Sequence, residues 1–130
     1  MNPKLGLTRN IQRSNYALIT PDGYVASVFP GWTDCTPHVL ISAALGAGLS
    51  QYLVQFNRQT KGSGETAGDV WFLYVVAGQV RVNGKALSTG GFAYLPAQTA
   101  YAIRGGSAAG QLLVFRKKFE PLAGQKAPGF

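Results

Sequence analysis

Between positions 15 and 119 the sequence is a series of short β-prone runs, and glycine, proline or an Asn-Gly pair ends most of them. Apolar residues at helical spacing are almost absent, whereas β-branched and aromatic residues are frequent. The 17 glycines and 7 prolines are spread along the chain, which suits tight turns between short strands. About nine short strands without crossover helices favour an antiparallel sandwich or barrel over a parallel α/β fold.

The turn signals divide this region into a set of expected strands. Asn83-Gly84 lies within the run 79–87 and is the residue pair typical of a type I′ turn, so we expect a hairpin there. We expect the polar, glycine-rich stretch 58–68 to be a loop. The expected strands, with the hairpin counted as one run, are 15–20, 24–29, 38–45, 50–57, 69–78, 79–87, 90–96, 100–106 and 110–119.

The same pattern places one barrel domain, residues 15–119, between two segments that lack it. A chain of 130 residues is long enough for one domain with one core. Residues 1–14 are expected to be an N-terminal arm. The stretch EPLAGQKAPGF, residues 120–130, is expected to be a C-terminal tail or a linker to another domain.

Composition and charge indicate where the protein resides and which kinds of partner it binds. No apolar run approaches the roughly 20 residues that a membrane-spanning helix needs, and the N-terminus lacks the apolar core of a signal peptide. The sequence therefore predicts a cytoplasmic protein that does not enter a membrane. The net charge is +7, but the basic residues form no dense tract and no nucleic-acid-binding motif accompanies them. We expect a solvated surface, or a basic face toward an acidic partner subunit, and no nucleic acid.

The stretch DCTPH contains the single cysteine, Cys35, and the single histidine, His38. One cysteine excludes a disulfide within the chain. A nucleophile and a base three residues apart are conceivable as a catalytic pair. The alternative is a small buried thiol and a loop histidine, which neighbours in a proline-containing loop favour.

The run YVVAGQVRVNGKALSTGGFAYLPAQTAYAI, within residues 62–104, resembles the two conserved motifs of the cupin superfamily. The shared features are a strand, a glycine turn, an Asn-Gly hairpin, a GG turn and the segment YLPA. The resemblance implies an all-β, double-stranded β-helix, that is, an RmlC-like jelly-roll barrel.

A second resemblance covers residues 8–130. The stretches TRNIQRSNYALITPDGYVASVFPGWTDC, GAGLSQYLVQF and FRKKFEPLAGQKAPGF look like the N-terminal half of the bacterial (S)-ureidoglycine aminohydrolases, also called glyoxylate-induced proteins. These enzymes are bicupins, which release ammonia from ureidoglycine in purine (allantoin) degradation with a manganese ion. In that family the metal and substrate residues belong to the C-terminal cupin. The resemblance therefore implies a non-catalytic cupin here, with manganese in a partner or following cupin.

The cupin metal ligands are two histidines in the pattern His-x-His, then a glutamate, then a later histidine. The corresponding positions are Gly64, Thr66, Trp71 and Tyr101. None offers the imidazole or carboxylate that a divalent ion prefers, so we expect no metal in this chain. Glu65 and Asp69 are close in sequence, and a shift of register could turn one inward, but we expect both to be solvated.

Trp71 and Tyr101 leave two possibilities open for the barrel interior. They can fill the space of a metal and its waters, or they can line a pocket for a small ligand. The first predicts a structural domain that pairs with itself as a homodimer or with a second cupin. The second predicts a small-molecule sensor. The apolar run NYALITPDGYVASVFPGW, residues 15–32, is the expected interface segment.

Overall fold

The computed structural model describes residues 11–12, 17–18, 25–26, 29–41, 48–106 and 108–120. Every regular element in this part of the chain is a β-strand, and it contains no helix suited to crossing a membrane. The strands are β1 (Ile11–Gln12), β2 (Ala17–Leu18), β3 (Val25–Ala26), β4 (Trp32–Ile41), β5 (Ser50–Glu65), β6 (Asp69–Ala77), β7 (Gln79–Val82), β8 (Lys85–Ser88), β9 (Phe92–Leu95), β10 (Ala100–Gly105) and β11 (Gly110–Lys118).

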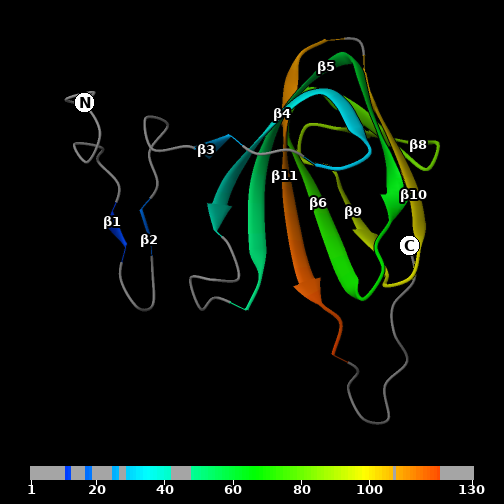
Figure 1. Ribbon diagram of the computed structural model, residues 1–130. Helices are drawn as coiled ribbons and strands as arrows, with labels where there is room; N and C mark the ends of the chain where they lie inside the picture. The colour runs from blue at the N-terminus through cyan, green and yellow to red at the C-terminus, as the bar shows by residue number, and fades with distance from the viewer. Residues whose placement is uncertain are drawn as a thin grey trace.

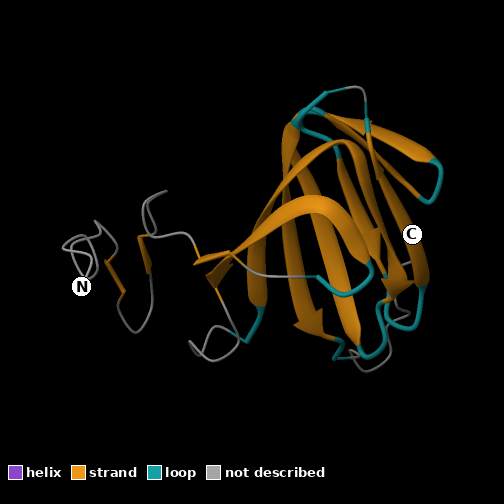
Figure 2. Ribbon diagram, turned by 45° about the horizontal axis from the view of Figure 1, so that its top comes forward, coloured by secondary structure: helices purple, strands orange, loops and turns teal. Residues whose placement is uncertain are grey.

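β5 organises the barrel because it takes part in both of its walls (Figure 1). Its first half pairs with β11 and its second half pairs with β10, while β4 pairs along its other side. One wall consists of β5, β11, β6 and β9, and the other consists of β5, β10, β7 and β8. Figure 2 shows these strands wrapping around a common interior. The prediction of an all-β antiparallel barrel is confirmed.

The expected loop at 58–68 is wrong over most of its length, because β5 continues to Glu65. Gly68 lies in the turn before β6, but Gly62 serves packing rather than turning. Gly62 lies opposite Trp32 of β4, and a Cβ atom there would come within 2.6 Å of the Trp32 ring. Since real Cβ atoms do not approach that closely, the indole needs a glycine beneath it. β4 likewise begins at Trp32, so DCTPH lies in a strand and not in a loop.

The expected hairpin is confirmed. β7 pairs with β8, and both Asn83 (φ 49°) and Gly84 (φ 82°) have the positive φ that a type I′ turn requires. The turn lets β7 and β8 pair directly at one end of the strand order.

Strict alternation along β6 builds the core. Trp71, Leu73 and Val75 are buried, whereas Phe72 and Tyr74 between them are exposed. Val54 of β5 and Val114 of β11, among others, complete an aliphatic interior with the inward side chains of β7, β9 and β10. Most of the N-terminal arm 1–14, the C-terminal tail after residue 120 and most of the expected interface run 15–32 lie outside the described residues.

Candidate functional site

Four aromatic side chains from distant parts of the sequence meet at one end of the barrel interior. We call Phe29, Trp32, Trp71 and Tyr101 the inner aromatic cluster; each is at least nine-tenths buried. Ring centroids of Trp71 and Tyr101 are 4.9 Å apart, and those of Phe29 and Trp32 are 5.2 Å apart. These separations are typical of favourable aromatic packing.

A buried hydrogen bond orients the cluster. The Trp32 Nε1–H donates to the Tyr101 hydroxyl at 2.9 Å. Gly64 is the cross-strand partner of Tyr101, and a Cβ atom at Gly64 would lie 3.2 Å from that hydroxyl. The absence of a side chain at Gly64 therefore leaves room for the phenol.

Three of the four cupin ligand positions, Gly64, Trp71 and Tyr101, come together at this end of the barrel. The fourth, Thr66, does not line the same space. Its hydroxyl donates to the carbonyl of Pro96 at 2.6 Å and accepts from the backbone N–H of Thr99 at 3.0 Å. Thr66 therefore links the turn before β6 to the turn before β10 through these hydrogen bonds.

The side chains gathered here do not fit a divalent metal ion, because the converging groups are indoles, a phenol and a guanidinium. No group of three or more His, Cys, Asp or Glu residues suited to a metal gathers among the described residues. Glu65 is exposed at the rim. Asp69, which was expected to be solvated, accepts a hydrogen bond from Arg116 (Asp69 Oδ2 to Arg116 Nη2, 3.3 Å).

Arg116 is a site residue that the sequence argument missed. Its guanidinium carbon lies 4.7 Å from the Trp71 ring centroid, a cation–π contact. Alternation was the available signal, since Leu112 and Val114 are buried and Arg116 continues that phase of β11. The charge therefore stands at the inner end of the strand rather than on the outer face.

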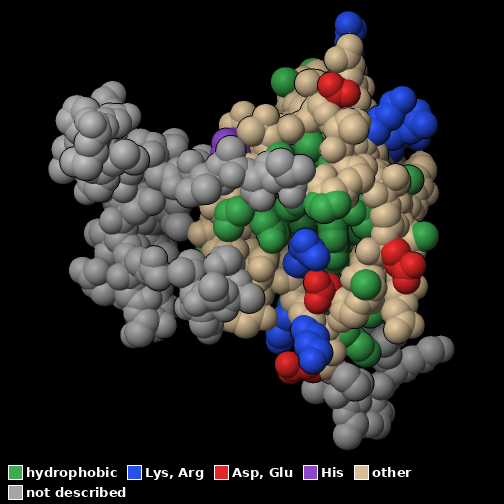
Figure 3. Space-filling view, viewed as in Figure 1, with side chains coloured by type: hydrophobic (Ala, Val, Ile, Leu, Met, Phe, Trp, Pro, Cys, Tyr) green, Lys and Arg blue, Asp and Glu red, His purple; other side chains and the backbone are tan. Residues whose placement is uncertain are grey.

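Beside the inner aromatic cluster is a cavity of about 300 Å³, lined by Phe29, Pro30, Trp32, Gly64, Glu65, Trp71, Tyr101 and Arg116. It combines aromatic walls with charged groups. Figure 3 shows hydrophobic side chains at the centre of one face with Lys or Arg and Asp or Glu side chains directly beside them, a similar mixture. Trp71 and Tyr101 pack against each other and also border this cavity.

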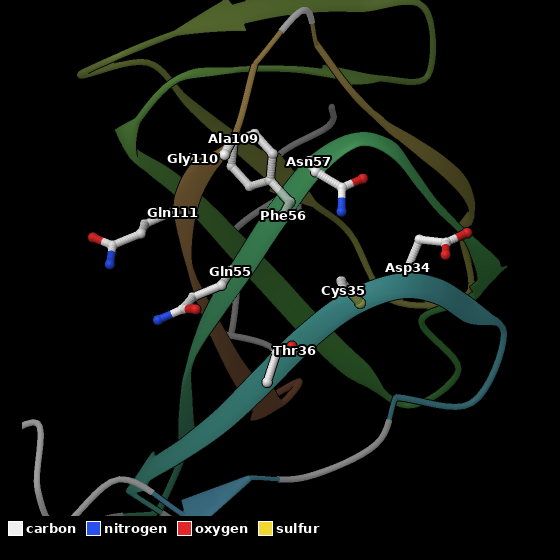
Figure 4. A pocket seen from close by; sticks show the side chains of 9 residues that line it. All are labelled: Asp34, Cys35, Thr36, Gln55, Phe56, Asn57, Ala109, Gly110 and Gln111. Atoms are coloured by element: carbon white, nitrogen blue, oxygen red, sulfur yellow. The ribbon is translucent and has the colours of Figure 1, made fainter.

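A larger hollow of about 660 Å³ lies between β4, β5 and β11 (Figure 4). Gln55 and Gln111 point to one side of it, and Asp34 points the other way. Burial, with a smaller contribution from the charge of Asp34, raises the pKa of the Cys35 thiol, which lowers its nucleophilicity at neutral pH. The lining groups do not converge on one point.

The strand geometry also separates Cys35 from His38. Both lie on β4, three residues apart, with cross-strand partners Phe56 and Leu53. Residues an odd number apart on a strand project to opposite faces. The catalytic pair considered from sequence is therefore not assembled by this fold.

A second group of aromatic residues faces outward from the β11–β6–β9 wall. We call Phe72, Tyr74, Phe92, Tyr94 and Phe115 the outer aromatic cluster. Phe72 stacks on Phe92 with centroids 5.5 Å apart and lies 6.3 Å from Phe115. Phe92 is 63% exposed, and Phe72 and Tyr74 are each more than a third exposed.

Comparison with curated proteins finds relatives along almost the whole chain. The (S)-ureidoglycine aminohydrolase of Escherichia coli (strain K12) is 31% identical over 121 residues, which cover 88% of this chain and 46% of that protein. The enzyme of the same name from Arabidopsis thaliana is 31% identical over 123 residues, covering 90% of this chain and 41% of that protein. The chain spans about half the length of the curated relatives it matches. No family model matches it.

Solved structures agree with this result. Protein Ylba from E. coli, of family DUF861, superposes with a TM-score of 0.79 at 29% identity over 99% of this chain and 56% of that chain. An RmlC-like cupin from Shewanella frigidimarina superposes with a TM-score of 0.65 at 15% identity, over 86% of this chain and 96% of that chain. The second likeness bears on the fold alone, and that fold is the expected one.

Proposed function

Since the chain is a cupin related in sequence to the (S)-ureidoglycine aminohydrolases, we propose that it is a non-catalytic cupin domain with a structural role in assembly. The observation that carries this proposal is the composition of the cupin metal positions. At these positions Trp71 and Tyr101 contribute packed rings, and Gly64 contributes only backbone. The hydroxyl of Thr66 is hydrogen-bonded to a neighbouring turn. A barrel built in this way has the cupin fold without the metal-ligating side chains.

The proposed partner is another cupin domain. The relatives are about twice as long as their matched portion, so the region that corresponds to this chain occurs in them beside further sequence. In this chain the outer aromatic cluster supplies an apolar surface for such contact. Exposed apolar patches rimmed by polar residues commonly mark association sites.

We propose that the chain acts in the cytoplasm, in purine (allantoin) degradation. The ground for this proposal is its resemblance to the enzymes of that process. A manganese ion would then be held by the partner or following cupin and not by this chain. The role of this chain would be to position that cupin and to complete the assembly.

Sedimentation equilibrium of the purified chain at micromolar concentration tests the assembly role. We expect a homodimer, because a second copy is the one cupin partner available in that sample, and a standard interface buries on the order of 1,600 Å². A well-behaved monomer of 13.8 kDa would overturn the proposal that the chain assembles through its own surface.

Metal analysis tests the non-catalytic part separately. We expect no stoichiometric manganese, zinc or iron after dialysis. Retention of such a metal, lost on changing Glu65 or Asp69 to the corresponding amide, would show instead that the rim carboxylates form a metal site. The amides keep the size of the side chains, but Asp69→Asn also removes the charge that pairs with Arg116, so a melting curve of each variant accompanies the metal analysis.

A second candidate function, small-molecule binding in the barrel, is favoured by one observation. The inner aromatic cluster is packed, yet a cavity of about 300 Å³ remains beside it. That volume lies at the lower end of the range typical of small-molecule pockets.

A further inference from the structure

Three positively charged side chains lie in one cross-strand row on the outer face of the β5–β10–β7 wall. Arg104 of β10 pairs with Lys61 of β5 on one side and with Arg81 of β7 on the other. Residues in direct register project to the same face of a sheet, and all three are exposed. We call Lys61, Arg104 and Arg81 the cationic row. Neighbouring strands are about 4.8 Å apart, so the row extends over about 10 Å.

Acidic side chains do not balance the charge of this row. β7, β8 and β10 contain no Asp or Glu, and among the described residues none of the three cations is in an ion pair. Glu65 lies four residues from Lys61 along β5, about 13 Å away. Asp34 follows the cross-strand partner of Lys61 on β4 and offsets part of the charge at that end. The unbalanced charge is therefore carried by Arg104 and Arg81.

The side chains beside the row are neutral and leave it accessible. Ser63 and Ala102 pair with each other in the next outward row, and Gln79 lies two residues before Arg81 on β7. Arg81 Nη1 donates to the Gly84 carbonyl at 3.4 Å, which leaves its other N–H groups available to a partner.

The row does not stabilise the isolated barrel. Like charges directly opposite each other on a sheet repel. The strand spacing of about 4.8 Å is shorter than the Debye length of about 8 Å at physiological ionic strength, so salt screens this repulsion only in part. Negative groups placed above the row would replace the repulsion by attraction. The row is therefore suited to contact with an anionic partner.

Several features favour an acidic protein over other anionic partners. A second copy of the chain would bring its own net charge of +7. Single-stranded nucleic acid is held by aromatic side chains on which bases stack, whereas glutamine, serine and alanine flank this row. Duplex binding commonly uses about 6–10 phosphate contacts, more than the row supplies. A carboxylate, in contrast, matches the planar fork of a single guanidinium.

We propose that the cationic row binds an acidic face of a partner protein that differs in sequence from this chain, with Asp or Glu carboxylates accepting hydrogen bonds from Arg104 and Arg81. The sequence left open a solvated surface or a basic face toward an acidic partner, and the proposal places that face on the β5–β10–β7 wall. It goes beyond the proposed self-association, because the outer aromatic cluster lies on the other wall and binds through apolar surface.

Fluorescence anisotropy with a labelled oligoglutamate peptide tests the proposal on the full chain. Oligoglutamine of the same length is the uncharged control, and an oligothymidine strand and a DNA duplex are the nucleic-acid probes. We expect saturable binding of oligoglutamate that weakens as salt is added, because the contacts join exposed charges. Oligoglutamine should not bind, and both nucleic acids should bind more weakly than oligoglutamate.

Matched double variants separate the row from net charge. Arg81→Gln with Arg104→Gln removes two charges from the row, and Lys117→Gln with Lys118→Gln removes two exposed charges at the end of β11. Each pair lowers the net charge from +7 to +5. The first pair should weaken oligoglutamate binding by about tenfold or more, and the second by about threefold or less. Arg81→Lys with Arg104→Lys keeps the charge without the planar fork, so its loss should be intermediate. A melting curve verifies the fold of each variant.

Any of three results would overturn the inference. One is the absence of saturable oligoglutamate binding at low salt. Another is an equal loss in the two glutamine double variants, since binding would then follow net charge alone. The third is tighter binding of oligothymidine or the duplex than of oligoglutamate, which would indicate a nucleic-acid partner. Sedimentation equilibrium keeps the assembly proposal separate. A dimer that does not bind oligoglutamate would refute only the role of the cationic row, and a monomer that binds it would refute only self-association.

Discussion

The inner and outer aromatic clusters occupy opposite faces of the same wall, and neighbouring residues belong to different clusters. Trp71 is 5% exposed inside the barrel, and Phe72, the next residue of β6, is 38% exposed outside it. Both are large aromatic side chains on one strand. What differs is the surroundings: Trp71 packs against Tyr101 and Arg116, whereas Phe72 contacts Phe92, which is itself exposed.

This difference separates what stabilises the barrel from what remains available to a partner. The side chains of the inner cluster are each at least nine-tenths buried, so removing a ring leaves a hole or an unpaired polar atom. The outer cluster keeps more exposed apolar area, most of all at Phe92. Burial of that remaining area is still to be gained by association.

The opposite wall shows that an aromatic exterior is not a general feature of this barrel. The outward positions of β7 and β10 include Gln79, Arg81, Ala102 and Arg104, all exposed. The two walls share one apolar interior but differ on their outer faces. For this reason we propose the β11–β6–β9 wall, rather than the β7–β10 wall, as the surface for a cupin partner.

The largest effect on stability is expected for a residue of the inner aromatic cluster. Trp71→Ala should lower the free energy of unfolding by about 3–5 kcal/mol, the usual range for truncating a buried large aromatic. Chemical denaturation followed by circular dichroism measures it, since Trp32 fluorescence would also respond to local changes. A near-neutral result would mean that Trp71 borders a hydrated pocket and is not part of the packed core.

The next effect concerns the glycine beneath Trp32. Gly62→Ala should destabilise the chain by about 1–3 kcal/mol, because the added methyl group overpacks against the indole. Gly68→Ala is the matched control, since a Cβ atom there meets nothing within 4 Å. Equal unfolding midpoints for the two variants would show that the Trp32 ring moves to accommodate the methyl group and that the inner cluster is not closely packed.

A polar contact within the inner cluster should contribute less. Tyr101→Phe keeps the ring and removes the acceptor of the Trp32 Nε1–H, so the free energy of unfolding should fall by about 1 kcal/mol. Thermal and urea unfolding both measure this change. A variant more stable than the parent would indicate that the hydroxyl is poorly satisfied in the native barrel.

Much of the fold was predictable from the sequence, because its turn chemistry is local. Asn83-Gly84 predicts its hairpin from two residues. The run 69–77 is apolar nearly throughout, so the sequence predicts a strand there but not which face of β6 turns inward. The stretch 58–65 could not be assigned in this way. Its glycines resemble turn signals, but Gly62 lies against the Trp32 ring and Gly64 lies against the Tyr101 ring, both contributed from at least thirty residues away.

The candidate site was predicted in part. Counting from turn residues located Trp71 and Tyr101, because β6 and β10 keep regular spacing from Gly78 and Pro96. The same counting could not show that Thr66 bonds to the Pro96 carbonyl or that Arg116 reaches Trp71. Those contacts depend on which strands adjoin, and strand order is a long-range property. The expected interface in 15–32 stays a prediction.

The smallest effect on folding, and the one that best separates the two clusters, is expected at Phe92. This ring is 63% exposed on β9, so Phe92→Ser removes little buried surface from the isolated chain. Its unfolding free energy should change by no more than about 0.5 kcal/mol, as for most surface substitutions. If the outer cluster is the assembly surface, the same variant should shift sedimentation equilibrium toward monomer, since truncating an apolar anchor weakens an interface. Arg104→Ser on the opposite wall is the control and should alter neither quantity. A Phe92→Ser chain that assembles like the parent would place the contact elsewhere, and one that unfolds readily would show that the outer rings support the barrel after all.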